Sequence, residues 1–157
     1  MAIEREPVAM KARCLCDKTA IDINGEAKLS MLCHCEKCRM VSGLAGANVL
    51  FSEDDVEVTG DFIVFQHGTP NGDTTTNYTC KGCGVTVMRK ASTTPGMIMV
   101  SLGCLDKPDT FTPDYQIWTA QKLPWLIDDG SIASSSDGAA VAERLQLVLS
   151  NLDNEIQ

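Results

Sequence analysis

Alternation of apolar and polar residues runs through much of the chain and predicts short β-strands. Residues 27–31, for example, place apolar side chains at every second position, which is typical of a half-buried strand. Apolar or β-branched runs predict further strands at residues 20–23, 47–51, 56–58, 62–65, 74–79, 85–88, 97–102 and 115–119. Asn24-Gly25 is the strongest two-residue hairpin signal. Residues 20–23 and 27–32 flank it, so they are expected to pair.

The C-terminal part has a different pattern. Residues 130–138 form a loop rich in Ser, Gly and Asp, and Asp137 could cap a helix that begins near Gly138. One apolar stripe with helical spacing follows, at Val141, Leu145, Val148, Leu149 and Leu152. We expect this helix to pack on the sheet rather than to bind a partner. The sequence thus predicts a β domain over residues 8–128, followed by a loop and an amphipathic helix over residues 129–157.

Length and charge narrow the possible functions. A chain of 157 residues can bury about two thirds of its unfolded surface and so does not need disulfides to fold. Its 13 Lys and Arg against 21 Asp and Glu give a net charge of −8, which disfavours binding to nucleic acid or to an acidic membrane surface. Small-molecule substrates are the expected partners, and the sequence does not indicate an oligomeric state.

Two further observations concern localisation. No apolar run approaches the roughly 18 residues of a membrane span. Residues 1–10 contain Glu4, Arg5 and Glu6 and lack the apolar core of a signal peptide. We therefore expect a cytoplasmic protein in a reducing compartment.

Cysteine is the most informative residue type. Seven of the eight cysteines fall into three clusters, and Cys104 stands alone as an expected core or strand-end thiol. The clusters are Cys14 with Cys16, Cys33 with Cys35 and Cys38, and Cys80 with Cys83. Clustered cysteines in a reducing compartment indicate metal binding. Thiolate ligands in tetrahedral geometry favour zinc.

The number of clustered cysteines suggests two zinc ions with different roles. Seven thiolates make one site with four ligands and one with three. A zinc ion with three protein ligands keeps a position open for substrate or water, whereas four ligands close the site. Cys33, Cys35 and Cys38 are close enough in sequence to form the three-ligand site. The closed site would then contain Cys14, Cys16, Cys80 and Cys83, although spacing alone leaves the pairing of the clusters open.

These motifs resemble those of the glutathione-dependent formaldehyde-activating enzyme family, which includes the centromere protein V type domain. The order is Cys-x-Cys, then Cys-His-Cys-x-x-Cys-Arg with a nearby Ser-Gly, then Cys-x-x-Cys-Gly. The matching residues are Cys14, Cys16, Cys33, His34, Cys35, Cys38, Arg39, Ser42, Gly43, Cys80, Cys83 and Gly84. Weaker matches, among them Ile117-Trp118 and Pro124-Trp125, extend the resemblance over residues 12–127.

The resemblance implies a β-rich fold, either a small sheet or a sandwich, related to a zinc-binding exchange-factor accessory protein. It implies a closed structural zinc at Cys14, Cys16, Cys80 and Cys83. It also implies a reactive zinc at Cys33, Cys35 and Cys38 that faces the substrate. The activity attached to the family is a carbon–sulfur lyase or synthase step, in which formaldehyde joins glutathione as S-hydroxymethylglutathione.

Single residues near the clusters have less distinctive patterns. Arg39 could bind a carboxylate of a ligand such as glutathione or form an ion pair with one of the many acids. His34 and His67 are expected to be structural or surface histidines, so the proton carrier stays unidentified. Trp118 and Trp125 are expected to pack in the core.

Three functions are consistent with the sequence. The first is a zinc-dependent carbon–sulfur lyase or synthase that acts on a thiol adduct of a small carbonyl compound. The second is a zinc enzyme of the same fold that acts on another small reactive metabolite. The third is a non-catalytic zinc module that binds a protein partner. Three cysteines with Arg39 beside them and no fourth cysteine nearby favour the enzymes over the module.

Overall fold

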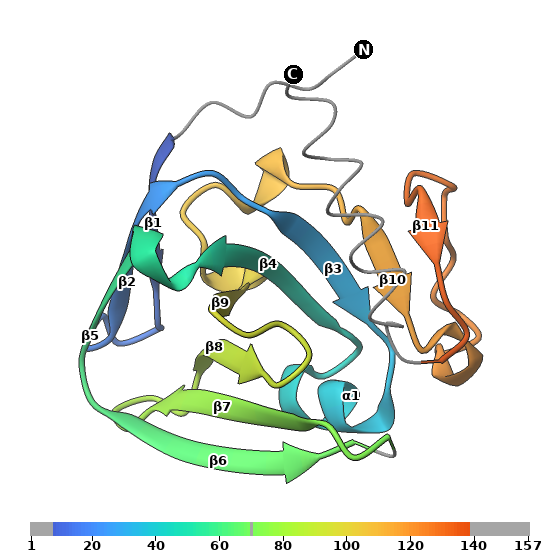
Figure 1. Ribbon diagram of the computed structural model, residues 1–157, viewed down its shortest axis with the longest axis horizontal. Helices are drawn as coiled ribbons and strands as arrows, with labels where there is room; N and C mark the ends of the chain where they lie inside the picture. The colour runs from blue at the N-terminus through green and yellow to red at the C-terminus, as the bar shows by residue number, and fades with distance from the viewer. Residues whose placement is uncertain (1–7, 70, 139–157) are drawn as a thin grey trace.

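The computed structural model describes residues 8–69 and 71–138, which form two β-sheets with one short α-helix (Figure 1). The smaller sheet is antiparallel, in the order β1 (Val8–Arg13), β2 (Ala20–Gly25), β5 (Val56–Thr59). The larger sheet has the strand order β11-β10-β3-β4-β9-β8-β7-β6. The mainly β architecture expected from the sequence is therefore confirmed.

The strands of the larger sheet are antiparallel except at one edge, where β3, β10 and β11 run parallel to one another. Their bounds are β3 (Leu29–Cys33), β4 (Gly46–Ser52), β6 (Phe62–Gly68), β7 (Thr74–Cys80), β8 (Thr86–Ala91), β9 (Met97–Ser101), β10 (Tyr115–Ile117) and β11 (Ser134–Ser135). The helix α1 (Glu36–Ser42) follows β3 and lies against β4. Four 3₁₀ turns complete the described part: η1 (Glu53–Asp55), η2 (Leu102–Cys104), η3 (Pro108–Thr110) and η4 (Thr119–Gln121). None of these helices is long and apolar enough to cross a membrane.

The predicted hairpin at Asn24-Gly25 is wrong. β2 pairs with β1 and β5, whereas β3 pairs with β4 and β10 in the other sheet. A tight hairpin turn of this type needs a positive φ at both central residues, and neither Asn24 nor Gly25 has one. Gly25 serves close packing instead, because a Cβ there would lie 2.2 Å from Oδ2 of Asp55. The chain therefore continues from one sheet into the other at this point.

Two hydrophobic cores lie on opposite faces of the larger sheet. In β4, Val49 and Phe51 belong to one core and Leu50 to the other, as the alternation of a strand requires. Burial on both faces explains why Val49, Leu50 and Phe51 form a continuous apolar run within this strand. The first core contains Cys14 and Cys80. The second contains Cys33, so the two predicted metal sites lie in different cores.

Several elements differ from the sequence prediction. β1 and α1 were not predicted, and β6 extends beyond residue 65 to Gly68. In β1 the buried Met10 and Ala12 alternate with the exposed Lys11 and Arg13, and the strand pairs with β2 along its whole length. β11 lies within the segment that was expected to be a loop. The predicted C-terminal helix falls at residues 139–157, outside the described residues, so both this helix and the domain boundary at residue 129 stay predictions.

Candidate metal centres and cavity

Four cysteines meet where the ends of β1 and β7 approach each other. The Sγ atoms of Cys14, Cys16, Cys80 and Cys83 all lie within 4.8 Å of one another. The Sγ of Cys16 is 3.6 Å from that of Cys14 and 3.7 Å from that of Cys80. Zinc–sulfur bonds of about 2.3 Å in a tetrahedron place sulfurs about 3.8 Å apart, whereas a disulfide needs about 2.05 Å. The group could therefore hold a metal ion, and its distances and sulfur donors fit zinc.

Local backbone geometry explains how two neighbouring cysteines reach one site. Asp17 has a left-handed φ of 60°, which turns the chain back directly after Cys16. In the second turn a Cβ at Gly82 would lie 2.9 Å from Sγ of Cys16, so this close approach requires glycine. The bend expected within the Cys-x-Cys motif is thus present.

Backbone N–H groups stabilise charge on this cluster. Burial raises the pKa of the Cys14 thiol, but hydrogen bonds from Thr19 outweigh it and lower that pKa to about 5. The pKa of Cys80 is lowered as well, because the N–H groups of Cys83 and Gly82 outweigh the effect of burial. A thiolate is the form of cysteine that binds metal, so the surroundings of Cys14 and Cys80 favour metal binding.

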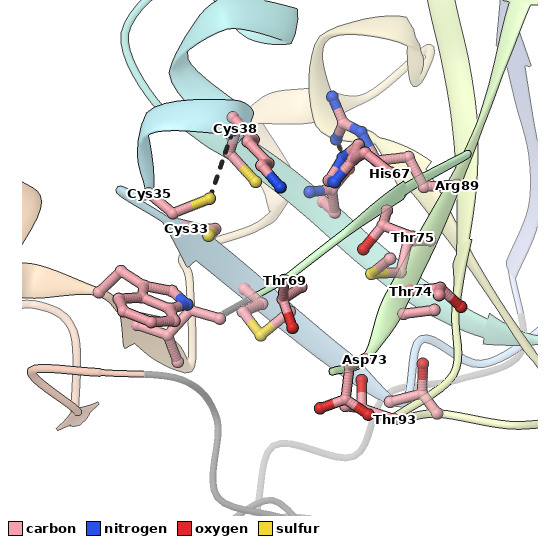
Figure 2. A pocket seen from close by; sticks show the side chains of 18 of the residues that line it. Cys33, Cys35, Cys38, His67, Thr69, Asp73, Thr74, Thr75, Arg89 and Thr93 are labelled. Carbon is pink, nitrogen blue, oxygen red and sulfur yellow. Dashed lines mark hydrogen bonds between the residues drawn. The ribbon is translucent and has the colours of Figure 1, made fainter. Parts of the chain in front are cut away.

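The three-cysteine cluster is built from the end of β3 and the first turn of α1. Cys33 is the last residue of β3, Cys35 is the N-cap of α1, and Cys38 lies in its first turn. Their Sγ atoms also lie within 4.8 Å of one another. Cys38 N donates to Sγ of Cys35 at 3.3 Å (Figure 2). Within the described part of the chain, the group has no fourth His, Cys, Asp or Glu ligand.

In this cluster the state with one ionised thiol is favoured over the state with two. Hydrogen bonds from Cys33 and Cys38 lower the pKa of Cys35 to about 2. Hydrogen bonds to Cys35 and Cys38, together with burial, raise the pKa of Cys33. Like charges at this distance repel, so a cation is needed before all three sulfurs can be ionised. This need for a cation also fits a metal ion.

The three-cysteine cluster forms part of the wall of a cavity of about 170 Å³. Across the cavity from the cysteines lie Thr74, Asp73 and Thr93, as Figure 2 shows. Lys37 closes one side by donating from Nζ to the carbonyl oxygen of Gly68, which ties α1 to the end of β6. An enclosed volume of about 150 Å³ admits a molecule the size of benzene. The cavity is thus large enough for a thiol group and a small carbonyl compound beside the cluster.

A family model described as glutathione-dependent formaldehyde-activating enzyme matches residues 9–121 of the chain. The chain belongs to this family. The match includes all seven clustered cysteines and so agrees with the resemblance seen in their spacing.

Among solved structures, this family member is similar to a crystal structure of a Rhodobacter sphaeroides protein that was a structural genomics target. The two share 22% sequence identity with a TM-score of 0.50. The similarity covers 62% of this chain and 88% of the other. At this identity it supports the fold alone. No curated protein matches the chain.

Sequence reasoning missed Arg89, the most buried charged residue of the cavity wall. Its side chain is 2% exposed. Arg89 lies in β8 opposite Met99 of β9 and Asn77 of β7, so it faces the core that contains Cys33. A charged residue after an apolar run ordinarily marks a strand end, which is why the prediction stopped at Met88. Continuing the period-two alternation by one residue would have placed Arg89 on the face opposite Met88.

His67 also lies in the cavity wall, although the sequence indicated a solvated surface residue. The extension of β6 to Gly68 brings its half-buried imidazole into the wall of the cavity (Figure 2). His34 is fully buried, and its Nε2 is 3.1 Å from Oε1 of Gln116. Burial lowers the pKa of His34. Its position agrees with the structural role expected from the sequence.

Arg39 lies outside the set of residues that line the cavity. Its Nη1 donates to the carbonyl oxygens of His34 at 3.1 Å and Gln121 at 2.5 Å, which joins α1 to η4. Its expected contact with a ligand carboxylate stays a prediction.

Trp118 lines the cavity with a strained backbone. Its φ of 56° and ψ of 40° are left-handed, a conformation that costs a bulky residue on the order of 1–3 kcal/mol. The strain follows from hydrogen bonding on both sides, because its N–H donates to Gly138 and its carbonyl accepts from Gln121. Trp125 is 63% exposed and lies outside this wall. The expected core packing of Trp125 is therefore wrong, because the loop that carries it leaves its ring at the surface.

Proposed function

We propose that this family member is a zinc-dependent carbon–sulfur lyase or synthase that acts on the thiol adduct of a small carbonyl compound, of the glutathione and formaldehyde type. One observation carries the proposal. Three thiols, with no fourth ligand in the described residues, form part of the wall of a cavity. Such a set leaves one coordination position for a substrate, whereas the four-cysteine group is complete.

The two cysteine groups would hold two zinc ions with different roles. Cys14, Cys16, Cys80 and Cys83 would hold a structural zinc that joins β1 to β7. Cys33, Cys35 and Cys38 would hold the reactive zinc. A zinc ion in the second group would lower the pKa of an incoming thiol, so that the thiol binds as a nucleophilic thiolate at neutral pH.

The reaction requires one proton to move. When the thiol sulfur attacks the carbonyl carbon, a C–S bond forms, the C=O π pair moves to oxygen, and the proton lost from sulfur ends on that oxygen. Lysis is the reverse of these steps. Within the described cavity wall His67 is the only imidazole, and it is half-buried, so it is the residue we assign to carry this proton. The cavity walls would hold the two reactants together and limit access of water.

The test is chemical exchange in the full-length, zinc-loaded protein. NMR exchange spectroscopy on an equilibrium mixture of glutathione, formaldehyde and S-hydroxymethylglutathione measures the rate of C–S bond formation and cleavage above the spontaneous rate. We expect acceleration that Cys38→Ser abolishes. His67→Gln should slow exchange with little change in thiol affinity. Lys107→Gln, a surface variant outside the cavity wall, serves as the matched control.

Other results would redirect the assignment. Acceleration with cysteine or another small thiol but not with glutathione would keep the reaction and change the substrate. If exchange is accelerated neither with glutathione nor with another small thiol, and thiols and aldehydes have no effect on the metal site, a non-catalytic zinc module would be favoured.

A further inference from the structure

Arg89 is a buried guanidinium with no carboxylate partner in residues 8–69 and 71–138. Its three nitrogen atoms donate to neutral side chains. Nε donates to Oδ1 of Asn77 at 3.0 Å, Nη1 to Oδ1 of Asn48 at 2.6 Å, and Nη2 to Oγ of Ser42 at 2.8 Å. Three of the five N–H groups of an arginine are thus bonded. The other two have no acceptor within the described residues.

A buried charge without a counter-ion is costly. Transfer of an ion out of water costs several kcal/mol unless an opposite charge is nearby. The thiols of the three-cysteine cluster line the same cavity, and their negative charge would favour the Arg89 guanidinium. Three elements, α1, β4 and β7, each contribute one acceptor that fixes the guanidinium in place. The fold therefore holds a positive charge rigidly beside the position where a substrate sulfur would bind.

We propose that Arg89 binds the oxygen of the thiol–carbonyl adduct and stabilises its negative charge as the C–S bond forms or breaks. This inference rests on the proposed function and adds a residue to it. In RS⁻ + H₂C=O → RS–CH₂–O⁻, the oxygen that receives the electron pair is separated from sulfur by one carbon atom. Arg89 lines the same cavity as the three cysteines. A fixed donor is most effective at a charge that appears only during the reaction.

The binding test uses two thiols of nearly equal size. Mercaptoacetate places an anionic oxygen close to its sulfur, and mercaptoacetamide places a neutral amide there. We measure their Kd values for the zinc-loaded full-length protein by isothermal titration calorimetry. We expect wild type to prefer mercaptoacetate by about tenfold, because a charge-assisted bond to guanidinium is about twice as strong as a neutral one. Arg89→Gln should lose this preference.

Lys90→Gln is the matched control. It removes the same charge from the adjacent residue, but Lys90 lies outside the cavity wall and pairs with Glu53. It should keep the preference for mercaptoacetate. In the exchange assay Arg89→Gln should slow the reaction about 100-fold, as removal of an oxyanion donor does. Its affinity for mercaptoacetamide and its content of two zinc ions should not change.

Three results would overturn the proposal. These are equal wild-type affinity for the two thiols, loss of the second zinc in folded Arg89→Gln, and an exchange rate in that variant equal to wild type. If Arg89→Gln does not fold, Ser42→Ala decides. Ser42 is exposed, and its replacement removes one of the hydrogen bonds that position the guanidinium of Arg89. An unchanged preference for mercaptoacetate together with an unchanged exchange rate would reject the assignment.

The two proposals can fail separately. Absence of any catalysed exchange, with the Arg89-dependent preference for mercaptoacetate intact, would reject the proposed function and leave an anion site. Catalysed exchange that does not depend on Arg89 would reject only the role of Arg89.

Discussion

The thiol of Cys35 caps helix α1 by accepting a hydrogen bond from the backbone N of Cys38 at 3.3 Å. The same two residues contribute two of the three sulfurs of the cavity cluster. One turn of backbone thus orders the helix and brings two candidate ligands together. The two roles can be separated by substitution.

Cys35→Ser should separate capping from metal binding. Serine keeps an acceptor at the N-cap but lacks the soft thiolate, whereas Cys35→Ala lacks both. We expect both variants to contain one zinc instead of two, and Cys35→Ala to be less stable than Cys35→Ser by about 1 kcal/mol. Elemental analysis and urea unfolding measure these quantities. Retention of two zinc ions in Cys35→Ser would contradict the assignment of this ligand.

Loss of a ligand from the four-cysteine group should destabilise the fold far more than loss of a ligand from the three-cysteine cluster. A structural zinc contributes about 10–16 kcal/mol of apparent binding free energy, comparable to the whole stability of a domain, about 5–15 kcal/mol. We expect Cys80→Ser to be largely unfolded by circular dichroism, whereas Cys38→Ser stays folded. Equal thermal stability of the two variants would show that the groups do not differ in structural role.

Gly60 should tolerate alanine less well than Gly72. Both have positive φ, at 110° and 85°, so both substitutions carry a backbone cost of about 1–2 kcal/mol. At Gly60 a Cβ would also lie 2.5 Å from the backbone oxygen of Lys18, whereas at Gly72 nothing lies within 4 Å. We expect Gly60→Ala to lower the free energy of unfolding by at least about 2 kcal/mol more than Gly72→Ala. Urea titrations of both variants measure the difference.

Trp118 should report ligand binding through its fluorescence. The chain has two tryptophans, and Trp118 lines the cavity whereas Trp125 does not. In Trp125→Phe the remaining signal comes from Trp118, so we expect a thiol ligand to change its intensity or wavelength. Trp118→Phe should show no ligand-dependent change. A response carried by Trp125 instead would place the ligand outside this cavity.

The ion pair between Lys90 and Glu53 should add a small pH-dependent stability. Lys90 Nζ is 2.6 Å from Oε1 of Glu53, and the hydrogen bond to this carboxylate raises the pKa of Lys90 above its ordinary 10.5. Because the pKa of Lys90 is higher in the folded state than in the unfolded state, the ion pair stabilises the fold at pH values below the unfolded-state pKa. This stabilisation is lost as the pH rises through the folded-state pKa. Both side chains are about 40% exposed, so we expect wild type to exceed Lys90→Gln by less than about 1 kcal/mol at pH 7. Urea unfolding at pH 7 to 11 should show the difference shrinking above pH 10.5, whereas growth of the difference there would contradict it.

The cysteine clusters could be predicted from the sequence because their chemistry is local. Cys33, Cys35 and Cys38 lie within one turn of chain, so any compact backbone brings their sulfurs together. Cys80 and Cys83 are joined in the same way. That these two join Cys14 and Cys16 depends on β1, which the sequence pattern did not indicate.

Most strands could be predicted from alternating positions or from short apolar and β-branched runs, because these patterns reflect burial of one or both faces of a sheet. The pattern did not indicate which strands pair. Asn24-Gly25 has the composition of a hairpin turn, yet packing against Asp55 determines its conformation. Strand pairing depends on contacts between residues that are distant in sequence, and a local pattern does not indicate these contacts.

The sequence by itself determined the thiol chemistry, the grouping of Cys33, Cys35 and Cys38, and the β-rich character of this protein, because these follow from residue type and short spacing. Only the tertiary structure decided which polar groups surround the three thiols. Arg89 and His67 reach the cavity from β8 and β6, and their positions depend on strand register and on where each strand ends. A shift of one residue in either strand would turn these side chains to the opposite face of the sheet.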